Sequence, residues 1–223
     1  MQHIQRWLSH FSALFSVALA LQACRTTPSG VANAAHIRGT IADIAGDVLT
    51  VATPAGSVRI ALPHLPVVAT AVQSDRSRLA DGSFLGITSV AQLDGSQRAV
   101  EVHIFPETMR GAGEGSYAWD LPGAGTGGSK MTNGTATSSR MTNGTVSAES
   151  GGTSLTLLYN EGTSAGSQTI AIPPDIPVVA LEPGGRSDLA LGAPVFVVAQ
   201  KRRDGTLTAS RILVGKGGVI PPM

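Results

Sequence analysis

The chain contains an internal duplication, and this feature constrains its fold more than any other. The segment IALPHLPVVA at residues 60–69 returns as IAIPPDIPVVA at residues 170–180, with one inserted residue. Further collinear matches pair 38–41 with 143–146, 78–82 with 188–192, and 94–95 with 204–205. A match of this extent predicts a duplicated unit of roughly 70 residues, the size of one small domain rather than of a solenoid repeat.

Composition and local pattern both favour β structure. Charged residues make up 14% of the chain, against about 25% in an average domain, while Gly (27) and Pro (13) are frequent. Val58, Ile60 and Leu62 alternate with more polar neighbours, as in a half-buried strand. The Asp-Gly pairs at 94–95 and 204–205 are typical of hairpin turns. We therefore expect an all-β protein with five or six short strands in each repeat.

One short helical turn is expected in each repeat, in the first at residues 75–80. Five or six strands with little edge protection favour closure into a small barrel.

The order of these signals resembles a family of small exported bacterial proteins of unknown function with OB-like β-barrel repeats. The residues that carry the resemblance are Gly39, 58–62, Leu79, Gly82, 94–95 and Ala99, then Gly144, 170–173, Leu189, Gly192, 204–205, Ala209 and Ile212. The resemblance implies two tandem OB-like barrels and export, and it implies no catalytic residues.

The predicted organisation has six parts. They are a signal peptide with a signal helix (1–23), a tether (24–35), the first OB-like barrel (36–105), a Gly-rich inter-repeat loop (106–140), the second OB-like barrel (141–215) and a C-terminal tail (216–223). A smaller echo repeats 130–135 at 140–145. The second copy leads into the predicted first strand of the second repeat, and the first copy is either a slipped duplicate or a competing start for that strand.

The N-terminal segment indicates export. The apolar run at 11–21 is too short to span a bilayer and fits the core of a secretory signal. Leu21-Gln22-Ala23-Cys24 resembles a bacterial lipobox, and Cys24 is the only cysteine in the chain. We expect lipidation at Cys24 and a membrane-anchored lipoprotein facing the periplasm, at the outer membrane. Ordinary cleavage after Ala34 is the alternative, and it would release a soluble periplasmic protein.

Residues 103–120 contain the chain's densest group of side chains that could bind a ligand or a metal ion. The candidate ligand or metal residues there are His103, Glu107, Arg110, Glu114, Trp119 and Asp120. One imidazole and three carboxylates, at His103, Glu107, Glu114 and Asp120, are ligand types that could bind a divalent metal ion. The competing interpretation is structural. In it His103 ends a strand on the polar face, Trp119 and Phe105 cap a barrel end, and Glu107 or Glu114 pairs with Arg110 at the surface.

Two motif matches and the net charge exclude other function classes. Residues 162–166 match G-x-S-x-G, but they fall in a predicted hairpin and no histidine follows them. Residues 123–128 match G-x-G-x-x-G without the helix that such a phosphate-binding motif requires. A net charge of +1 argues against nucleic acid as a partner.

We therefore expect a non-enzymatic cell-envelope lipoprotein that binds a small ligand, an ion or an envelope protein through the inter-barrel segment. Its membrane contact would be the N-terminal lipid anchor only. The alternatives are a divalent-metal-binding protein or metal-dependent hydrolase, and a purely structural envelope spacer.

Overall fold

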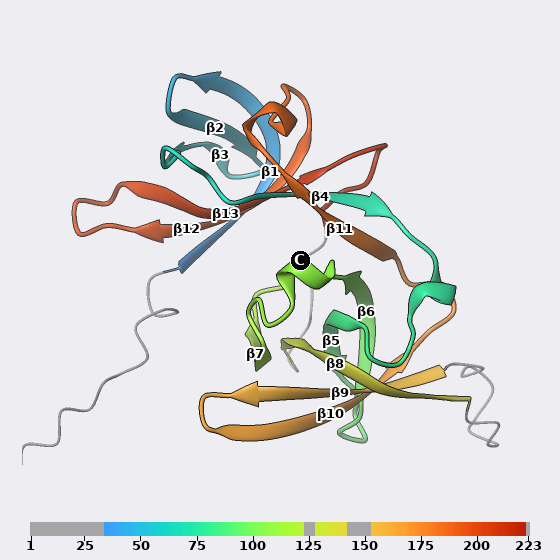
Figure 1. The fold of residues 1–223 in the computed structure, drawn as a ribbon. Coiled ribbons are helices and arrows are strands. Elements are labelled where there is room, and N and C mark those ends of the chain that lie inside the picture. The colour runs from blue at the N-terminus through green and yellow to red at the C-terminus, as the bar shows by residue number, and fades with distance from the viewer. Residues whose placement is uncertain (1–33, 123–127, 142–152, 222–223) are drawn as a thin grey trace, which may run out of the picture. The chain divides into compact units, whose positions relative to one another are not determined.

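A computed structural model describes residues 34–122, 128–141 and 153–221, and these residues form a single 13-stranded sheet (Figure 1). The expected all-β class is confirmed. The predicted signal helix, Cys24 and the matched segment 143–146 lie outside the described residues. The first repeat supplies β1 (Ala34–Ala45), β2 (Val48–Thr53), β3 (Gly56–Ala61), β4 (Val68–Gln73), β5 (Phe84–Ala91) and β6 (Gln97–Ile104).

The remaining strands follow the same order. The segment 106–140, which we expected to be a Gly-rich loop, contains β7 (Gly115–Trp119) and nearly all of β8 (Ser129–Met141), so the second repeat begins before residue 141. It continues with β9 (Thr153–Glu161), β10 (Ser164–Ile172), β11 (Val178–Gly184), β12 (Pro194–Lys201) and β13 (Leu207–Gly215). Short 3₁₀ helices occur at η1 (Arg76–Arg78), η2 (Glu107–Met109) and η3 (Arg186–Asp188). The predicted helical turn at 75–80 is therefore η1, and η3 is its counterpart in the second repeat.

The strands close into two five-membered rings. One ring runs β1-β2-β3-β13-β12 and closes where β12 pairs with β1. The other runs β8-β9-β10-β6-β5 and closes where β5 pairs with β8. Each ring contains one parallel pair. β3 pairs in parallel with β13, the second strand of the hairpin β12–β13, and β10 pairs in parallel with β6, the second strand of the hairpin β5–β6.

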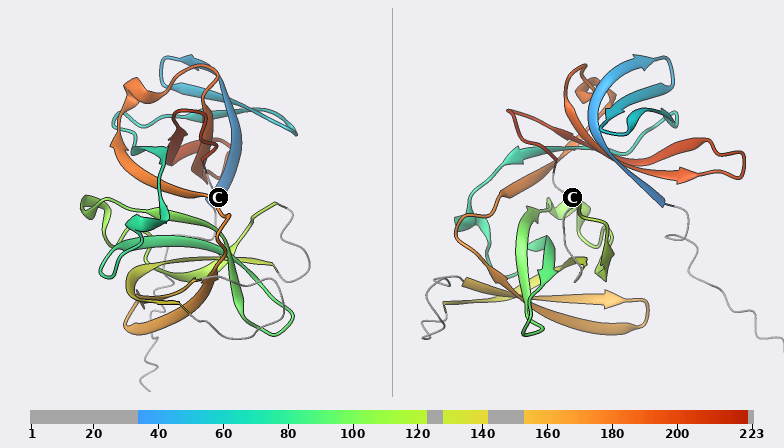
Figure 2. Two further views of the ribbon diagram at one scale, coloured as in Figure 1. Left: turned by 90° about the vertical axis from the view of Figure 1, so that its right-hand side faces the viewer. Right: turned by 180° about the vertical axis from the view of Figure 1, so that it is seen from behind.

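The repeats exchange their C-terminal hairpins. The hairpin β5–β6 of the first repeat pairs with β8 and β10, while β12–β13 of the second repeat pairs with β1 and β3. Figures 1 and 2 show this as a blue and red group of strands and a separate green and gold group. Two tandem barrels, each built from one contiguous repeat (36–105 and 141–215), are therefore not confirmed.

The central pair β4–β11 joins the two rings. β4 pairs in parallel with β13 in one ring, and β11 pairs in parallel with β6 in the other. The two strands pair with each other in antiparallel fashion, with Ala71 opposite Leu181. β4 thus leads the chain out of the ring that contains β1–β3 and toward the ring that contains β8–β10, which is where β5 and β6 pair.

Three hydrophobic clusters follow this arrangement. The first combines Leu49 and Ile60 with Val197 and Ile212, and thus joins residues of both repeats inside one ring. The second does the same in the other ring, with Ile87 and Val102 packed among residues of β9 and β10. The third lies with β4 and β11 and contains three phenylalanines, Phe84, Phe105 and Phe196. Burying these clusters is the main favourable contribution to folding.

The backbone structure shows which copy of the smaller sequence echo corresponds to the first strand of the first repeat. Gly39 in β1 packs against the carbonyl of Ala52, and a Cβ at that position would overlap it. Gly134 in β8 stands in the same relation to the carbonyl of Leu158. The ladders shift register shortly after each glycine, between Ile41 and Asp43 and between Ala136 and Ser138. The structural counterpart of Gly39 is therefore Gly134, in the first copy of the echo, and not Gly144.

The alternation predicted for the third strand is confirmed. Ile60 and Leu62 are buried while Arg59 and Ala61 are exposed. Among the described residues no helix has the length and apolar character needed to cross a membrane.

The exchange of hairpins predicts which pairs of introduced cysteines can form a disulfide. Ala171 on β10 pairs with Arg98 on β6, and both residues are exposed. Neighbouring strands place such residues within the Cα separation that a disulfide needs. In a Cys24→Ser background, we expect Ala171→Cys with Arg98→Cys to cross-link within one chain, as detected by mass spectrometry of proteolytic peptides.

The matched control is Ala171→Cys with Thr208→Cys. Thr208 on β13 pairs with Ala61, the counterpart of Ala171, so contiguous barrels would place Thr208 beside Ala171. Cross-linking of this second pair, and not of the first, would show that the hairpins are not exchanged.

Candidate functional site

The inter-repeat segment folds over a small cavity lined by both repeats. The cavity has a volume of about 40 Å³. Met109, Tyr117, Trp119, Met131 and Asn133 line it from the inter-repeat segment and the start of β8. The other lining side chains are Ala69, His103, Phe105, Leu181, Phe196, Val198, Arg211 and Leu213, which come from β4, β6, β11, β12 and β13 and from the residue after β6.

His103 is the most deeply buried polar group of this cavity. Its side chain is fully buried, and neither ring nitrogen makes a hydrogen bond within the described structure. The nearest charged atom is Oε2 of Glu101, at 3.5 Å from Nε2. The expectation that His103 ends its strand on the polar face is wrong. Because an unsatisfied buried imidazole costs free energy, the position points to a group that the cavity is built to accept.

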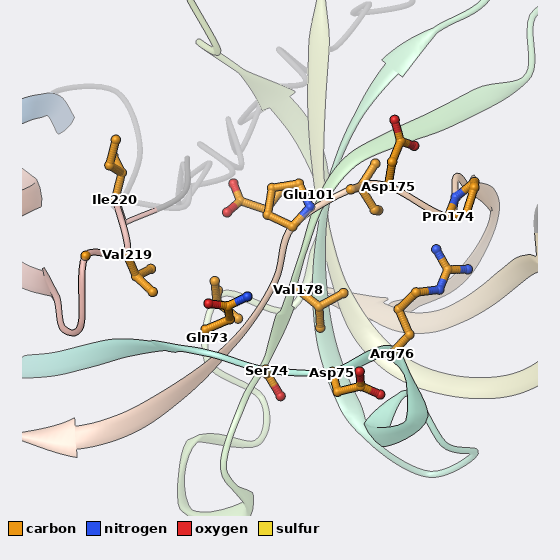
Figure 3. A pocket seen from close by; sticks show the side chains of 14 residues that line it. Gln73, Ser74, Asp75, Arg76, Glu101, Pro174, Asp175, Val178, Val219 and Ile220 are labelled. Carbon is orange, nitrogen blue, oxygen red and sulfur yellow. The ribbon is translucent and has the colours of Figure 1, made fainter.

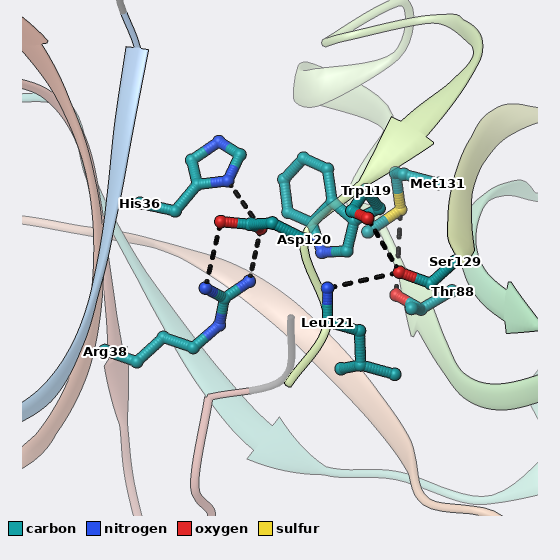
Figure 4. Close-up of polar contacts among 8 residues, drawn as sticks. All are labelled: His36, Arg38, Thr88, Trp119, Asp120, Leu121, Ser129 and Met131. Carbon is teal, nitrogen blue, oxygen red and sulfur yellow. Dashed lines mark hydrogen bonds and ion pairs between the residues drawn. The ribbon is translucent and has the colours of Figure 1, made fainter. Parts of the chain in front are cut away.

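Trp119 closes the cavity on the side of β7. It packs against His36, with 4.4 Å between ring centroids, and against Phe196 at 6.1 Å. Its indole Nε1 is buried and makes no hydrogen bond within the described residues. The strand that carries it is fixed to β8, because Ser129 donates to the Trp119 carbonyl and accepts from the Leu121 amide (Figure 4).

Asn133 secures the loop before β7. Its Nδ2 donates to the Gly113 carbonyl at 2.9 Å and lies 3.3 Å from the Tyr117 hydroxyl. Gly86 leaves the space that the Asn133 side chain occupies, since a Cβ there would overlap Oδ1. Burial raises the pKa of Tyr117, and the charge of Arg211 acts in the opposite direction. The Tyr117 hydroxyl therefore stays protonated at neutral pH.

Arg211 carries the formal charge of the cavity wall. It belongs to β13 and is half-buried. Within the described residues it makes no hydrogen bond and no ion pair. Its counterpart in the first repeat is Glu101, because Val198 faces Arg211 in one hairpin as Thr88 faces Glu101 in the other.

The predicted charged residues do not converge on one site. Glu107 pairs with Arg110, which also donates to the Gly82 carbonyl and to the Thr135 hydroxyl. The Glu114 carboxylate accepts from the backbone and side-chain nitrogens of Asn160 on β9. The surface pair expected between Arg110 and Glu107 is confirmed.

Asp120 binds β1, the first strand of the first repeat. Its Oδ1 accepts from Nδ1 of His36 and from an Nη of Arg38, both at 2.8 Å (Figure 4). Arg38 also lies over the Phe196 ring, 5.0 Å from its centroid. Together with Arg110 and Glu114, Asp120 attaches the inter-repeat segment at separate points around the cavity.

The proposed metal ligands are not brought together. His103 is inside the protein, while Glu107, Glu114 and Asp120 are each engaged elsewhere. Within the described part of the chain no cluster of three or more His, Cys, Asp or Glu side chains could hold a metal ion. The physical reason is that each carboxylate has a different partner: Glu107 binds Arg110 of its own segment, Glu114 binds β9 and Asp120 binds β1.

A second hollow, of about 610 Å³, lies beside the β4–β11 pair and is more open to solvent (Figure 3). Gln73, Asp75, Arg76 and Glu101 are among its lining residues. Asp75 accepts from the Ser77 amide, and Arg76 donates to the carbonyls of Ile172 and Pro173. Two of its four charged groups, Asp75 and Arg76, are thus engaged in holding turns. The fully buried His103 without a hydrogen bond makes the smaller cavity the stronger candidate site.

Sequence reasoning found His103 and Trp119 and missed Arg211, Asn133 and Phe196. A usable signal existed for Arg211. It is a charged residue within an otherwise apolar strand, at the position where the first repeat carries Glu101. Phe196 carried no such signal, because an aromatic side chain in a strand is usually part of a core.

The Asp120 network predicts a pH-dependent stability difference. Burial raises the pKa of Asp120, but hydrogen bonds from Arg38 and His36 outweigh it, so its pKa lies below the ordinary value. A lowered folded-state pKa stabilises the protein above about pH 4, and this contribution is lost as the pH falls through the folded-state pKa. We expect Asp120→Asn to lower the free energy of unfolding at pH 7 by up to about 1 kcal/mol, since Asp120 is half-exposed.

Urea unfolding at pH 7, 5 and 3 measures this effect, and the difference between the two proteins should vanish toward pH 3. Asp43→Asn, at an exposed position of β1, serves as the control. A difference that stays constant over the whole pH range would show that the Asp120 charge is not its cause.

Comparisons with protein-family models, with curated proteins and with solved structures found no significant match to this chain. The chemistry of the cavity therefore carries the functional inference.

Proposed function

We propose that this protein is a non-enzymatic binding protein of the bacterial cell envelope, which holds a small ligand in the cavity under the inter-repeat segment. The observation that carries the proposal is the fully buried His103, which lines this cavity and whose ring nitrogens make no hydrogen bond within the described residues, with the Glu101 carboxylate 3.5 Å from Nε2. The buried Trp119 Nε1 adds a second unsatisfied donor. A bound molecule with complementary groups would satisfy these atoms and recover the cost of their burial.

Binding is favoured over catalysis by the way the charged groups are used. Glu107, Glu114 and Asp120 hold the inter-repeat segment in place, so they are not available as a joint acid, base or metal site. The cavity walls are mainly apolar and aromatic with a few polar atoms, as in typical small-molecule sites. These observations weigh against the metal-dependent hydrolase.

The two rings are proposed to be OB-like barrels with exchanged hairpins. Each has five strands, and a 3₁₀ helix precedes each exchanged hairpin, at Arg76–Arg78 and Arg186–Asp188. OB folds are five-stranded, partly open barrels that present ligand sites on rigid strands. The resemblance to small exported bacterial proteins with such repeats stays a prediction.

The binding proposal predicts that filling the cavity abolishes ligand binding. Ala69 is buried on β4 and lines the cavity, so Ala69→Val would place two methyl groups inside it. A panel of small acids, amides, amines and alcohols can be screened by thermal unfolding. A ligand at 100 times its Kd should raise the Tm by about 5–10 °C. We expect Ala69→Val to remove this shift.

Ala91→Val, at an exposed position of β5, is the matched control and should keep the full shift. An unchanged shift in Ala69→Val would place the ligand elsewhere. If no compound of the panel raised the Tm, the purely structural spacer would replace the binding function.

We also propose that the protein is exported and anchored through a lipid on Cys24. Support comes from the apolar run at 11–21 and the lipobox-like sequence that ends at Cys24. The strand β1 adds a structural reason, because it begins at Ala34, which pairs with Gln200. Cleavage after Ala34 would remove a residue from this strand, whereas cleavage before Cys24 would leave β1 intact.

The anchor proposal predicts a specific labelling result. Cells that express the full chain and are grown with radiolabelled palmitate should incorporate label into the wild-type protein, because lipoprotein processing acylates the cysteine. Cys24→Ala should lose the label and move from the membrane to the soluble fraction. Equal labelling of both proteins, or no labelling of either, would contradict lipidation at Cys24.

A further inference from the structure

The wall of the small cavity has an unbalanced charge. Arg211 is the only Arg or Lys among the lining residues, and neither Asp nor Glu is among them. Arg211 has no ion-pair or hydrogen-bond partner among the described residues. A guanidinium that is half-buried without a counter-charge favours an anion beside it, because the attraction is weakly screened there.

Two of the uncharged polar side chains of the cavity can donate a hydrogen bond. Trp119 offers an indole N–H, which can only donate. His103 offers at least one N–H in either protonation state. Two acceptors are also present, the second nitrogen of a neutral His103 and Oδ1 of Asn133, which lies against Gly86 and makes no hydrogen bond within the described residues. The charge of Arg211 decides between the two kinds of ligand, because an anion would accept hydrogen bonds from the guanidinium and from these N–H groups.

The carboxylates nearest to these groups are not among the lining residues of the cavity. Glu101 lies 3.5 Å from Nε2 of His103 but lines the larger, open hollow. Asp120 binds His36 and Arg38, and Glu114 binds Asn160. None of the three lines the cavity, so Arg211 supplies the formal charge of the lining residues, and Glu101 lies behind His103.

Aromatic walls could also accept a small cation through cation–π attraction. Trp119 and Phe196 have suitable faces. A cation between them would, however, meet the charge of Arg211 in the same small space. The volume of about 40 Å³ admits a few water molecules, or an organic molecule of about four heavy atoms.

We infer that the ligand of this cavity is a small monocarboxylate, of the size of formate or acetate, held by Arg211 with Trp119 and His103 as further donors. The inference rests on the proposed binding function and names its ligand class. The carboxylate would accept from the guanidinium and the indole N–H, and a short apolar group would lie against Phe196 and Leu213.

Trp119 provides the probe for a direct test. The chain has two tryptophans, Trp7 and Trp119, so the full chain with Trp7→Phe reports on the cavity alone. Its fluorescence is titrated with formate, acetate and propionate, and with the neutral isostere acetamide and the cation methylammonium. We expect acetate or formate to bind at least tenfold more tightly than acetamide, with no response to methylammonium.

Variants separate the charge from the cavity shape. Arg211→Met keeps the apolar stem and should weaken acetate binding at least tenfold while leaving acetamide unchanged. Arg203→Met, at an exposed arginine in the β12–β13 turn, should have no effect. Trp119→Phe keeps an aromatic ring without the N–H, and calorimetry should show a several-fold loss of acetate affinity. The Tm of each variant shows whether it is folded.

The outcomes distinguish this inference from the proposed function. Tighter binding of acetamide or methylammonium than of acetate would overturn the carboxylate assignment and leave a small-ligand site. Acetate binding that is unaffected by Arg211→Met would overturn it as well. If none of the five probes binds, the carboxylate assignment fails, and the wider panel with Ala69→Val decides whether the binding function fails with it.

Discussion

Backbone hydrogen bonds between the two repeats are the interaction on which the rest of the structure depends. Neither the three strands β1–β3 nor the three strands β8–β10 close a ring alone, and each set is completed by the hairpin of the other repeat. The apolar residues follow the same rule, since Ile60 packs with Ile212 in one ring and Ile170 with Val102 in the other. The repeats therefore share their cores and are expected to unfold together.

Two similar repeats produce a cavity that is not symmetric. The register places His103 opposite Gly86 in one hairpin and Leu213 opposite Phe196 in its counterpart. Small and polar residues in the first hairpin thus meet large and apolar ones from the second near the central pair β4–β11. The space and the unsatisfied nitrogens arise because the two copies diverged at these positions while keeping the same strand register. Function is therefore proposed where the duplication is least exact.

The candidate site was predictable in part. A high density of chemical groups at 103–120 correctly drew attention to His103 and Trp119, which line the cavity. The same density was misleading for Glu107, Glu114 and Asp120, which attach the segment to its surroundings. Side chains close in sequence converge only if the backbone folds them toward one point. Here Glu107 in η2 binds Arg110 of its own segment, while Glu114 and Asp120, on either side of β7, bind different strands. Arg211 came from a distant strand that only the tertiary structure brings close.

The sequence by itself determined the local structure. Alternating apolar residues, Asp-Gly turns and the repeated segment at 60–69 and 170–180 settled the β class and the strand order within each repeat, because these depend on neighbours along the chain. Only the tertiary structure decided which hairpin completes which ring. Both hairpins carry nearly the same pattern, so each offers similar backbone and apolar contacts to either partner. The direction of β4 and β11 determines which ring each hairpin completes. It therefore also determines the cavity that the two repeats form together.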